Sequence, residues 1–214
     1  MNKLLITIFS AIIGCISTHN AYAEDVKNYI AIDAGVNLPN DWSTKVNLDS
    51  SITAESKVNL DSSFHAGLKL GRQYESSRFE IEYQHGQSQV LNIGGVSNSI
   101  ENTSYIRYDA LTLNAFRTQS ITEDISVYAG GGMGIGYDKF PGASYTDCEC
   151  FSKTTGFGLT YLLRAGLEYE PMPNNYLFAQ YSEIYLPQSH SQSNKVEYDR
   201  NAIGTMTIGY RKTF

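Results

Sequence analysis

The chain lacks two features on which many membrane-spanning and nucleic-acid-binding proteins depend, long apolar runs and an excess of positive charge. After the first two dozen residues, no stretch approaches the roughly 18 consecutive apolar residues of a membrane-spanning helix. Lysine and arginine total 16 against 22 acidic residues, for a net charge of −6 at pH 7. This balance argues against a nucleic-acid-binding surface, so nucleic acid is not an expected partner. Any role in a membrane must therefore be carried by strands.

Motifs that would bind a cofactor or perform catalysis are also missing. The glycine-rich stretch at 129–137 does not have the G-x-G-x-x-G spacing, and neither Gly-Lys-Ser/Thr nor a helical pattern follows it. His190 and Ser191 are adjacent in a polar segment, but the His-x-Ser pattern associated with the lipid A deacylase barrel is absent. We therefore expect no cofactor, no catalytic residues and no enzymatic activity.

Cysteine is scarce, with three residues in the chain. Cys148 and Cys150 are separated by one residue, Glu149, in an acidic segment that contains no histidine. In an oxidising compartment they can form a tight disulfide, pair between molecules, or bind a metal with the neighbouring carboxylates. Because histidine is missing, we interpret Cys148 and Cys150 as a loop disulfide and expect no metal.

The amino terminus has the composition of a secretory signal peptide. A basic start at Lys3 is followed by an apolar run at 4–13, and Ala21-Tyr22-Ala23 forms a small-x-small cleavage site. We interpret 1–23 as a signal peptide on this basis. A loose lipobox ending at Cys15 offers an alternative, in which that cysteine becomes a lipidated first residue.

Residues 24–214 have the composition of one all-β domain, whose net charge without the single signal-peptide lysine is −7. Apolar residues make up 42% of the chain, and 16 tyrosines and 18 glycines suit short strands of alternating polarity. About 190 residues accommodate eight strands of roughly ten residues, whereas sixteen strands would not fit. We predict strands at 28–38, 63–72, 78–86, 105–117, 125–138, 158–170, 176–185 and 202–214.

The predicted connections alternate in length. Three are short, and four are long, the long ones lying at 39–62, 87–104, 139–157 and 186–201. Tight turns on one side and long loops on the other are typical of an outer-membrane barrel, whose long loops lie outside the cell. The sequence therefore predicts an eight-stranded antiparallel up-and-down transmembrane β-barrel.

Alternation along the strands separates an apolar face from a charged face. In the second predicted strand, Phe64 and Leu68 share one face and Lys69 lies on the other. If the apolar face meets lipid, the charges point into the barrel, where unpaired charges are costly and an ion-pair network is expected. If the turn centres between Tyr74 and Glu75, that network pairs Lys69 with the acid opposite it, Glu80, or otherwise with Glu82. The predicted inward charges are Asp33, Lys69, Glu80, Glu82, Arg164, Glu168 and Arg211.

Two points of this pattern stay open. Alternation alone does not show which face of the barrel meets water. A soluble ligand carrier of the lipocalin type would place its apolar face inside. In the fourth predicted strand, Leu111 and Leu113 share their face with Arg107 and Asp109. We expect that strand to leave the bilayer before Ala110 or to contain a bulge.

In the glycine-rich strand, alternate glycines are expected to face inward and make room for large side chains opposite. These are Gly130, Gly132, Gly134 and Gly136.

The first long connection contains a tandem duplication. Residues 43–54 and 55–66 share Lys-Val-Asn-Leu-Asp-Ser-Ser, which begins at Lys45 in one copy and at Lys57 in the other. Two copies are too few for a solenoid. We interpret the duplication as a lengthened surface loop, since added loop length costs little closure entropy.

The carboxy-terminal segment has the two-faced pattern of a closing strand. Tyr210 and Phe214 share one face, while Gly209 and Thr207 lie on the other. The segment resembles the assembly signal of bacterial outer-membrane proteins, carried here by Gly209, Tyr210 and Phe214, with Lys212 where a hydrophobic residue is usual. With this ending, the chain resembles the small outer-membrane barrels of the OmpA transmembrane-domain and OmpX type, including single-barrel surface antigens. The resemblance implies the barrel fold, localisation in the bacterial outer membrane, and both membrane lipid and the barrel-assembly machinery as partners.

The expected function is that of a structural or adhesive surface protein. Its four long loops would contact a host or other extracellular partner, because this architecture places recognition in exposed loops. One alternative is a narrow porin-like channel, which would conduct in planar bilayers. Another, with less support, is a lipid-modifying enzyme, whose activity would be lost when a loop histidine is changed.

Overall fold

The structure is a computed structural model, and it describes most of the chain after residue 25. The predicted signal peptide at 1–23, with the alternative site at Cys15, lies outside the described residues, as does His190. The interpretations of those segments therefore stay predictions. The described residues are 26–39, 42–49, 52–93, 96–97, 105–140, 143–145, 148–151, 154–187, 196–198 and 202–214.

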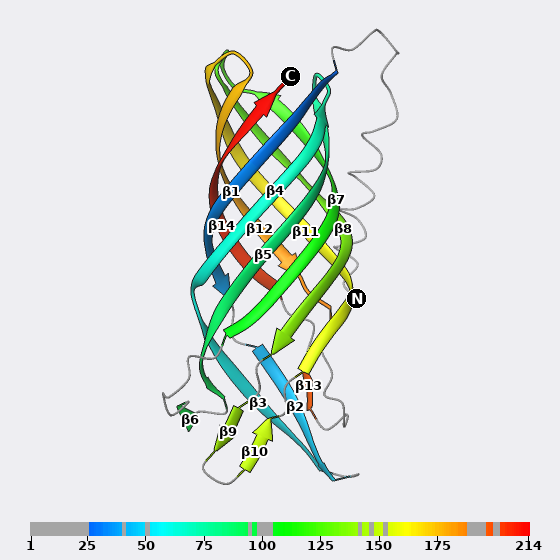
Figure 1. The fold of residues 1–214 in the computed structure, drawn as a ribbon, viewed down its shortest axis with the longest axis vertical. Coiled ribbons are helices and arrows are strands. Elements are labelled where there is room, and N and C mark those ends of the chain that lie inside the picture. Colours follow the sequence, from blue (N-terminus) through cyan, green and yellow to red (C-terminus); the bar gives the residue numbers. More distant parts are fainter. Residues whose placement is uncertain are drawn as a thin grey trace.

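Eight long antiparallel strands form a closed barrel (Figure 1). Their order around the barrel is β5-β4-β1-β14-β12-β11-β8-β7, and β7 pairs with β5 to complete the circle. Each predicted strand is present, so the predicted all-β barrel fold is confirmed. The eight strands are β1 (Lys27–Pro39), β4 (Ser63–Gln73), β5 (Ser77–Ile93), β7 (Tyr105–Ser120), β8 (Ile125–Phe140), β11 (Thr154–Met172), β12 (Asn175–Tyr185) and β14 (Ala202–Thr213).

The register of the strand pairs determines the tilt of the strands. Following paired residues once around the barrel from Asn28 leads to Leu38, ten residues further along the same strand. Such a stagger requires strands that are inclined to the barrel axis, as Figure 1 shows. Eight strands in this arrangement enclose a space that side chains can fill.

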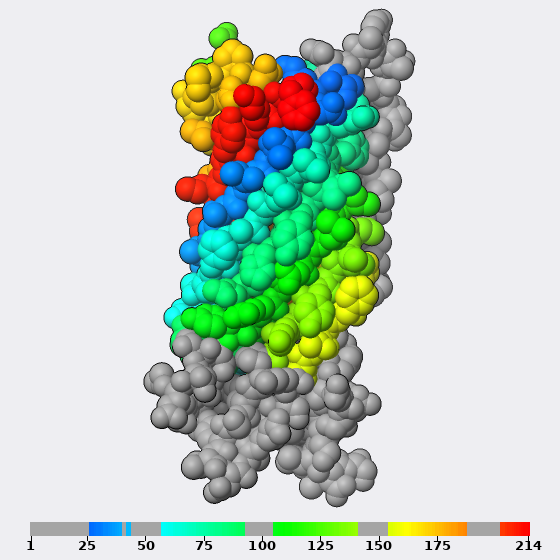
Figure 2. Space-filling view, in the orientation of Figure 1, coloured from blue at the N-terminus to red at the C-terminus, as the bar shows by residue number. Residues whose placement is uncertain are grey.

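The outer face of the barrel is apolar, whereas its inner face carries the charged and most other polar side chains, with apolar ones toward the extracellular end. β1 exposes Ile30, Ile32 and Val36 and buries Asp33 and Asn37 between them. The same division holds for the other strands, and Figure 2 shows the strands as a continuous surface of diagonal bands. This is the arrangement of a barrel in lipid and the reverse of a soluble carrier, so the lipocalin alternative is wrong. Within the described residues, no helix has both the length and the apolar composition needed to cross a membrane.

Short turns and long connections lie at opposite ends of the barrel (Figure 1). The carboxy terminus is at the end of the short turns, which in this architecture is periplasmic. The other, extracellular end carries six further strands, which lengthen the wall or form small hairpins. They are β2 (Trp42–Asp49), β3 (Ile52–Asp61), β6 (Val96–Ser97), β9 (Ala143–Tyr145), β10 (Cys148–Phe151) and β13 (Val196–Tyr198).

The expectation that 39–62 is only a loop is wrong, because β2 and β3 form an antiparallel hairpin there. Asp49 pairs with Ile52, so the hairpin reverses within the first copy of the duplication, while the second copy continues from β3 into β4. β3 pairs with the extended end of β5 and thus prolongs the barrel wall. The signal for these strands is in the repeat itself, since apolar and polar residues alternate along Lys-Val-Asn-Leu.

The fourth barrel strand, β7, is regular along its whole length. Its pairing with β5 and β8 shows no register shift, so the bulge alternative is wrong. Arg107 and Asp109 face outward like Leu111 and Leu113, but they lie nearer the extracellular end of the strand. The strand therefore carries these outward charges toward its extracellular end, and its exit from the bilayer before Ala110 stays a prediction.

The glycines of β8 face inward as predicted, but most of the space that they leave is taken by backbone of the neighbouring strand. At Gly130 and Gly134, an added Cβ would collide with backbone carbonyl groups of β7, and at Gly136 it would meet Thr160 and Pro187. These glycines therefore mainly permit close approach of the neighbouring chain, and at Gly130 the Phe116 ring also lies within 2.9 Å of the added Cβ. Glycines do make room for rings elsewhere, as where the Tyr128 ring covers Gly166.

Candidate functional site

The centre of the barrel interior is an arginine that binds two carboxylates across the lumen. Arg164 of β11 donates from Nη1 to Glu80 Oε1 (3.0 Å) and from Nη2 to Glu82 Oε1 (2.7 Å) on β5. Its Nε donates to Ser182 Oγ on β12 (2.8 Å), and Asn114 of β7 donates to Glu82 Oε2 (2.8 Å). One buried guanidinium thus connects three parts of the wall, in the charge-assisted geometry that is strongest for such pairs.

A second cation, Lys69, lies on the other side of Glu82. Its Nζ contacts Asp33 of β1 and is 3.4 Å from Glu82 Oε1. The β4–β5 register places Lys69 opposite Glu82, so the expectation of Glu80 opposite it is wrong, while the alternative partner Glu82 is present. The difference arises because Tyr74 N binds Ser77 O, which moves the centre of the turn one residue beyond the expected position.

The periplasmic part of the interior is held by one glutamate between two arginines. Glu168 of β11 accepts from Arg78 Nη1 at 2.5 Å and from Arg211 Nη2 at 2.7 Å. The guanidinium of Arg78 lies over the Tyr128 ring, 4.2 Å from its centroid, and that of Arg211 lies 3.9 Å from the Tyr176 ring. Aromatic faces therefore cover the cations where carboxylates do not.

These pairs form a balanced charge network, which we define as Asp33, Lys69, Arg78, Glu80, Glu82, Arg164, Glu168 and Arg211. It contains four cations and four carboxylates, and all eight are buried. Removing one partner of a buried pair typically costs about 3–5 kcal/mol, because the other charge is left uncompensated. Each member therefore depends on the others, and the arrangement holds strands together around the lumen.

The same arrangement offers little to catalysis or metal binding. Every carboxylate of the charge network is engaged by a cation, so none is placed as a free base beside a nucleophile. Within the part of the chain that the structure describes, no group of three His, Cys, Asp or Glu side chains could hold a metal ion.

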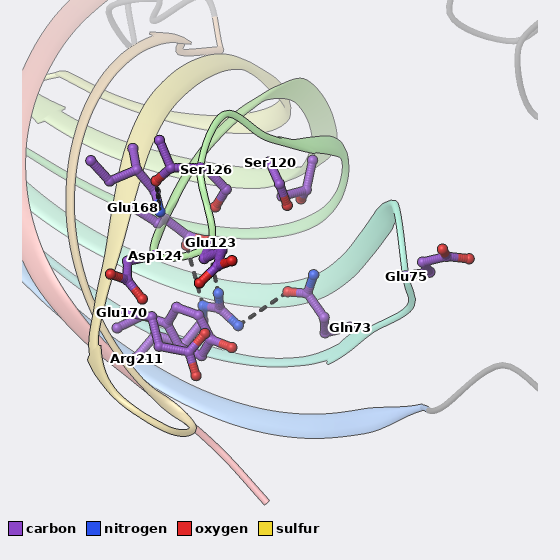
Figure 3. A pocket seen from close by; sticks show the side chains of 13 residues that line it. Gln73, Glu75, Ser120, Glu123, Asp124, Ser126, Glu168, Glu170 and Arg211 are labelled. Carbon is purple, nitrogen blue, oxygen red and sulfur yellow. Dashed lines mark hydrogen bonds and ion pairs between the residues drawn. The ribbon is translucent and has the colours of Figure 1, made fainter.

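The network opens to the periplasmic end through a small pocket (Figure 3). Arg211 and Glu168 line it, and Arg211 Nη1 donates to Gln73 Oε1 (3.1 Å) at its side. Its volume is about 110 Å³, and acidic residues surround the opening. These acids are Glu75, Glu123, Asp124 and Glu170. The pocket ends at the charge network. Within the described residues it is therefore a recess and does not continue as a channel.

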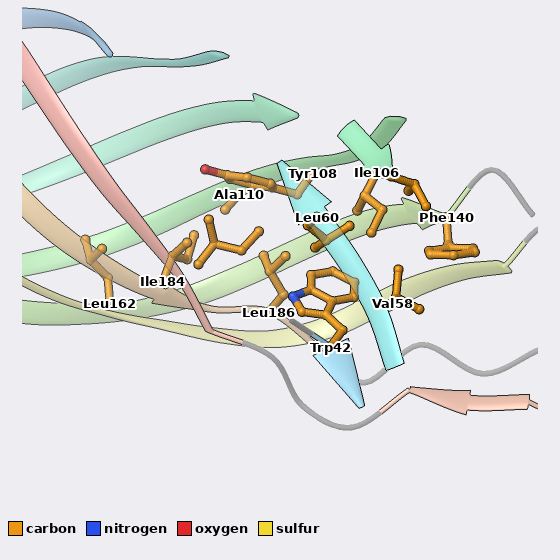
Figure 4. Close-up of a cluster of buried hydrophobic side chains, with 12 residues drawn as sticks. Trp42, Val58, Leu60, Ile106, Tyr108, Ala110, Phe140, Leu162, Ile184 and Leu186 are labelled. Carbon is orange, nitrogen blue, oxygen red and sulfur yellow. The ribbon is translucent and has the colours of Figure 1, made fainter. Parts of the chain in front are cut away.

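The extracellular part of the interior is filled by a different kind of contact, an apolar cluster (Figure 4). Trp42 of β2 and Val58 of β3 reach it from the hairpin, and Figure 4 shows them beside side chains from the barrel wall. We define the apolar cluster as Trp42, Val58, Leu60, Val90, Ile106, Tyr108, Ala110, Phe140, Leu162, Ile184, Leu186 and Ile203. The hairpin thus contributes to the core of the protein as well as to its surface.

The remaining predicted site residues lie apart from this interior. Cys148 and Cys150 are both in β10, whose side chains lie outside the described part, so their disulfide stays a prediction. Gly209 faces inward beneath the Phe178 ring, whereas Tyr210 and Phe214 face outward. Phe214 is 72% exposed, and its backbone pairs with Asn28 at the seam between the first and last strands.

Sequence reasoning missed several members of the interior. Arg78 belongs to the charge network and has the same parity as Glu80, so alternation could have found it. Tyr29 donates to Glu80 Oε2 (2.7 Å), and His65 lies 3.5 Å from Asp33. Both also have inward parity, but tyrosine and histidine occur on either face of a barrel, so composition gave no signal for them.

Fold and surface together define an eight-stranded β-barrel of the outer-membrane type. No protein-family description matches the chain, and no curated protein matches its sequence. Solved structures do resemble it. Neisserial surface protein A is 17% identical with a TM-score of 0.52, covering 87% of this chain and 97% of its own.

Two further solved structures have a similar fold. The outer membrane protein OprG from Pseudomonas aeruginosa is 19% identical with a TM-score of 0.60, covering 88% of this chain and 96% of its own. A major outer membrane protein from Thermus thermophilus is 12% identical with a TM-score of 0.54, covering 89% of this chain and all of its own. At these identities the likeness establishes the fold. With the apolar outer face, it places the protein among the small barrels of the bacterial outer membrane, as predicted.

Proposed function

We propose that the protein acts through its extracellular end, as a structural or adhesive surface protein of the outer membrane. The observation that carries this proposal is the filled interior, which the charge network occupies on the periplasmic side and the apolar cluster on the extracellular side. A solute would have to break buried ion pairs and displace packed apolar side chains to pass. The channel alternative therefore has little support.

The hairpin of β2 and β3 supports the same proposal. β3 continues the wall beyond the barrel through its pairing with β5, and β13 pairs with β2 on the other side of the hairpin. The described part of the extracellular end thus includes a paired sheet of β13, β2 and β3, anchored by Trp42 and Val58 in the apolar cluster. A fixed surface of this kind is suited to contact with a partner, because little conformational freedom is lost when it binds.

Two measurements on the same protein test the proposal. A non-adherent Gram-negative strain that displays the protein should bind to a monolayer of cultured epithelial cells more than the same strain with an empty vector. Purified protein in planar bilayers should show no stable conductance. Conductance without any gain in adhesion would overturn the proposal and support the channel.

A further inference from the structure

The outer face of the barrel carries two cations directly beside each other at its extracellular end. Arg107 of β7 is paired with Lys139 of β8 in an antiparallel ladder without register shifts. Both alternate with buried neighbours, and both are exposed on the outer face. Like charges directly opposite each other on adjacent strands destabilise a sheet, so an anion bound between them would stabilise the pair.

The protein itself does not supply that anion within the described residues. None of the ion pairs found there includes Arg107 or Lys139. The nearest acid along the same face is Asp109, two residues from Arg107. Its Oδ1 accepts from Tyr83 Oη (2.6 Å) and lies 2.9 Å from His85 Nδ1, so this oxygen is engaged with side chains of β5.

The surroundings of the pair indicate where the anion comes from. On the same face, Lys139 follows Met133, Ile135 and Tyr137, all of them exposed. Exposed apolar side chains continue onto β11, where Phe157 is 73% exposed. The two cations therefore lie at the extracellular edge of the lipid-facing surface, which is the level of lipid headgroups, beside an aromatic side chain typical of that level.

Polar neighbours extend the pair into a short row. Gln87 of β5 is paired with Arg107, and Thr155 of β11 is paired with Lys139. The row thus offers a guanidinium and an ammonium between an amide and a hydroxyl, all from rigid strands. Arginine and lysine together suit the several oxygens of a phosphate group, and the apolar surface below suits acyl chains.

We propose that Arg107 and Lys139 form a binding site for the phosphate group of a glycolipid in the outer leaflet, with its acyl chains against the apolar surface of β7, β8 and β11. The site is on the outside of the barrel, so it is independent of the filled interior and of any adhesive role of the loops.

Thermal stability of the folded barrel tests this site. Protein in a non-ionic detergent free of phosphate is mixed with bisphosphorylated lipid A, and the temperature at which the folded band is lost on gels is measured. A ligand that binds the folded state raises that temperature, and at a fixed ligand concentration the rise grows with the logarithm of its affinity. The wild-type protein should be stabilised. The double variant Arg107→Gln with Lys139→Gln should bind about thirtyfold more weakly, because each cation near a lipid surface contributes about 1 kcal/mol.

A matched control removes two outward cations at the other end of the barrel. Arg117→Gln with Lys212→Gln deletes the same charges near the periplasmic end and should leave the stabilisation by lipid A unchanged. Equal stabilisation of the Arg107/Lys139 variant would overturn the proposal. So would an equal effect of dephosphorylated lipid A, of phosphatidylglycerol or of inorganic phosphate, because none of these is a phosphorylated glycolipid.

Discussion

Lys69 lies opposite Glu82 in the ladder between β4 and β5, with its Nζ 3.4 Å from Glu82 Oε1. Glu80, two residues away, is bound by Tyr29 and by Arg164, which also binds Glu82. The two acids thus share Arg164 but differ in their contact with Lys69, and mutation can separate these pairings.

A double-mutant cycle should therefore distinguish the two acids. Lys69→Ala and Glu82→Ala should couple by about 1–3 kcal/mol in the free energy of unfolding, as contacting residues of one network do. The same cycle with Glu80→Ala is the control and should give a smaller coupling. Urea unfolding in detergent measures both cycles. Stronger coupling to Glu80 than to Glu82 would contradict the register described here.

Phe214→Ala should impair insertion while leaving export intact. The side chain is exposed and adds little to the folded barrel, but it ends the strand that must pair with β1 to close the edge. Fractionation should find processed protein in the periplasm, whereas the purified variant refolded in detergent should melt near the wild-type temperature. Normal outer-membrane levels of the variant would show that the terminal residue does not act as an assembly signal.

Deletion of 43–54 should leave the barrel folded. The excision removes most of β2 and the start of β3, none of which belongs to the eight barrel strands, and it keeps Val58 and Leu60 for the apolar cluster. The heat-modifiable band should persist, while adhesion that depends on the extracellular end should fall. Collapse to a protease-sensitive chain would mean that the hairpin is needed for barrel closure.

Gly166→Ala should destabilise the barrel by about 1–3 kcal/mol, the usual cost of overpacking. A Cβ at this position would lie 2.5 Å from the Tyr128 ring, which is held between Phe116 and the Arg78 guanidinium. Gly158→Ala is the matched control on the same strand, since its Cβ would only approach Pro187 at 3.3 Å. Equal unfolding free energies for the two variants would show that the ring can move aside.

Much of this fold could be predicted because a barrel strand repeats a two-residue pattern. Alternation identified all eight strands and placed Asp33, Lys69 and Arg164 on one face. It could not say how far around the barrel two inward charges lie from each other. The contacts of Arg164 with β5 depend on closure and stagger, which the register of every strand pair determines together.

The two wrong predictions, the partner of Lys69 and the loop at 39–62, have local causes. The partner of Lys69 changed because a turn reverses one residue later than expected, and a shift of one residue in the turn moves the opposite position by two. The hairpin of β2 and β3 was missed because a duplicated, polar segment between two strong strands has the composition of a loop. Its apolar positions acquire a core only when the barrel provides one, through residues such as Ile106 and Ile203.

Epitope accessibility on cells tests the central claim most directly, that an eight-stranded barrel presents its long connections outside. One tag is inserted in the turn between Asp49 and Ile52 of the hairpin, and another between Glu75 and Ser76 in the turn after β4. Both proteins should run as heat-modifiable bands. Antibody should label the first tag on intact cells and the second only after the outer membrane is permeabilised. Labelling of the second tag on intact cells, or a band that does not shift on heating, would contradict the account.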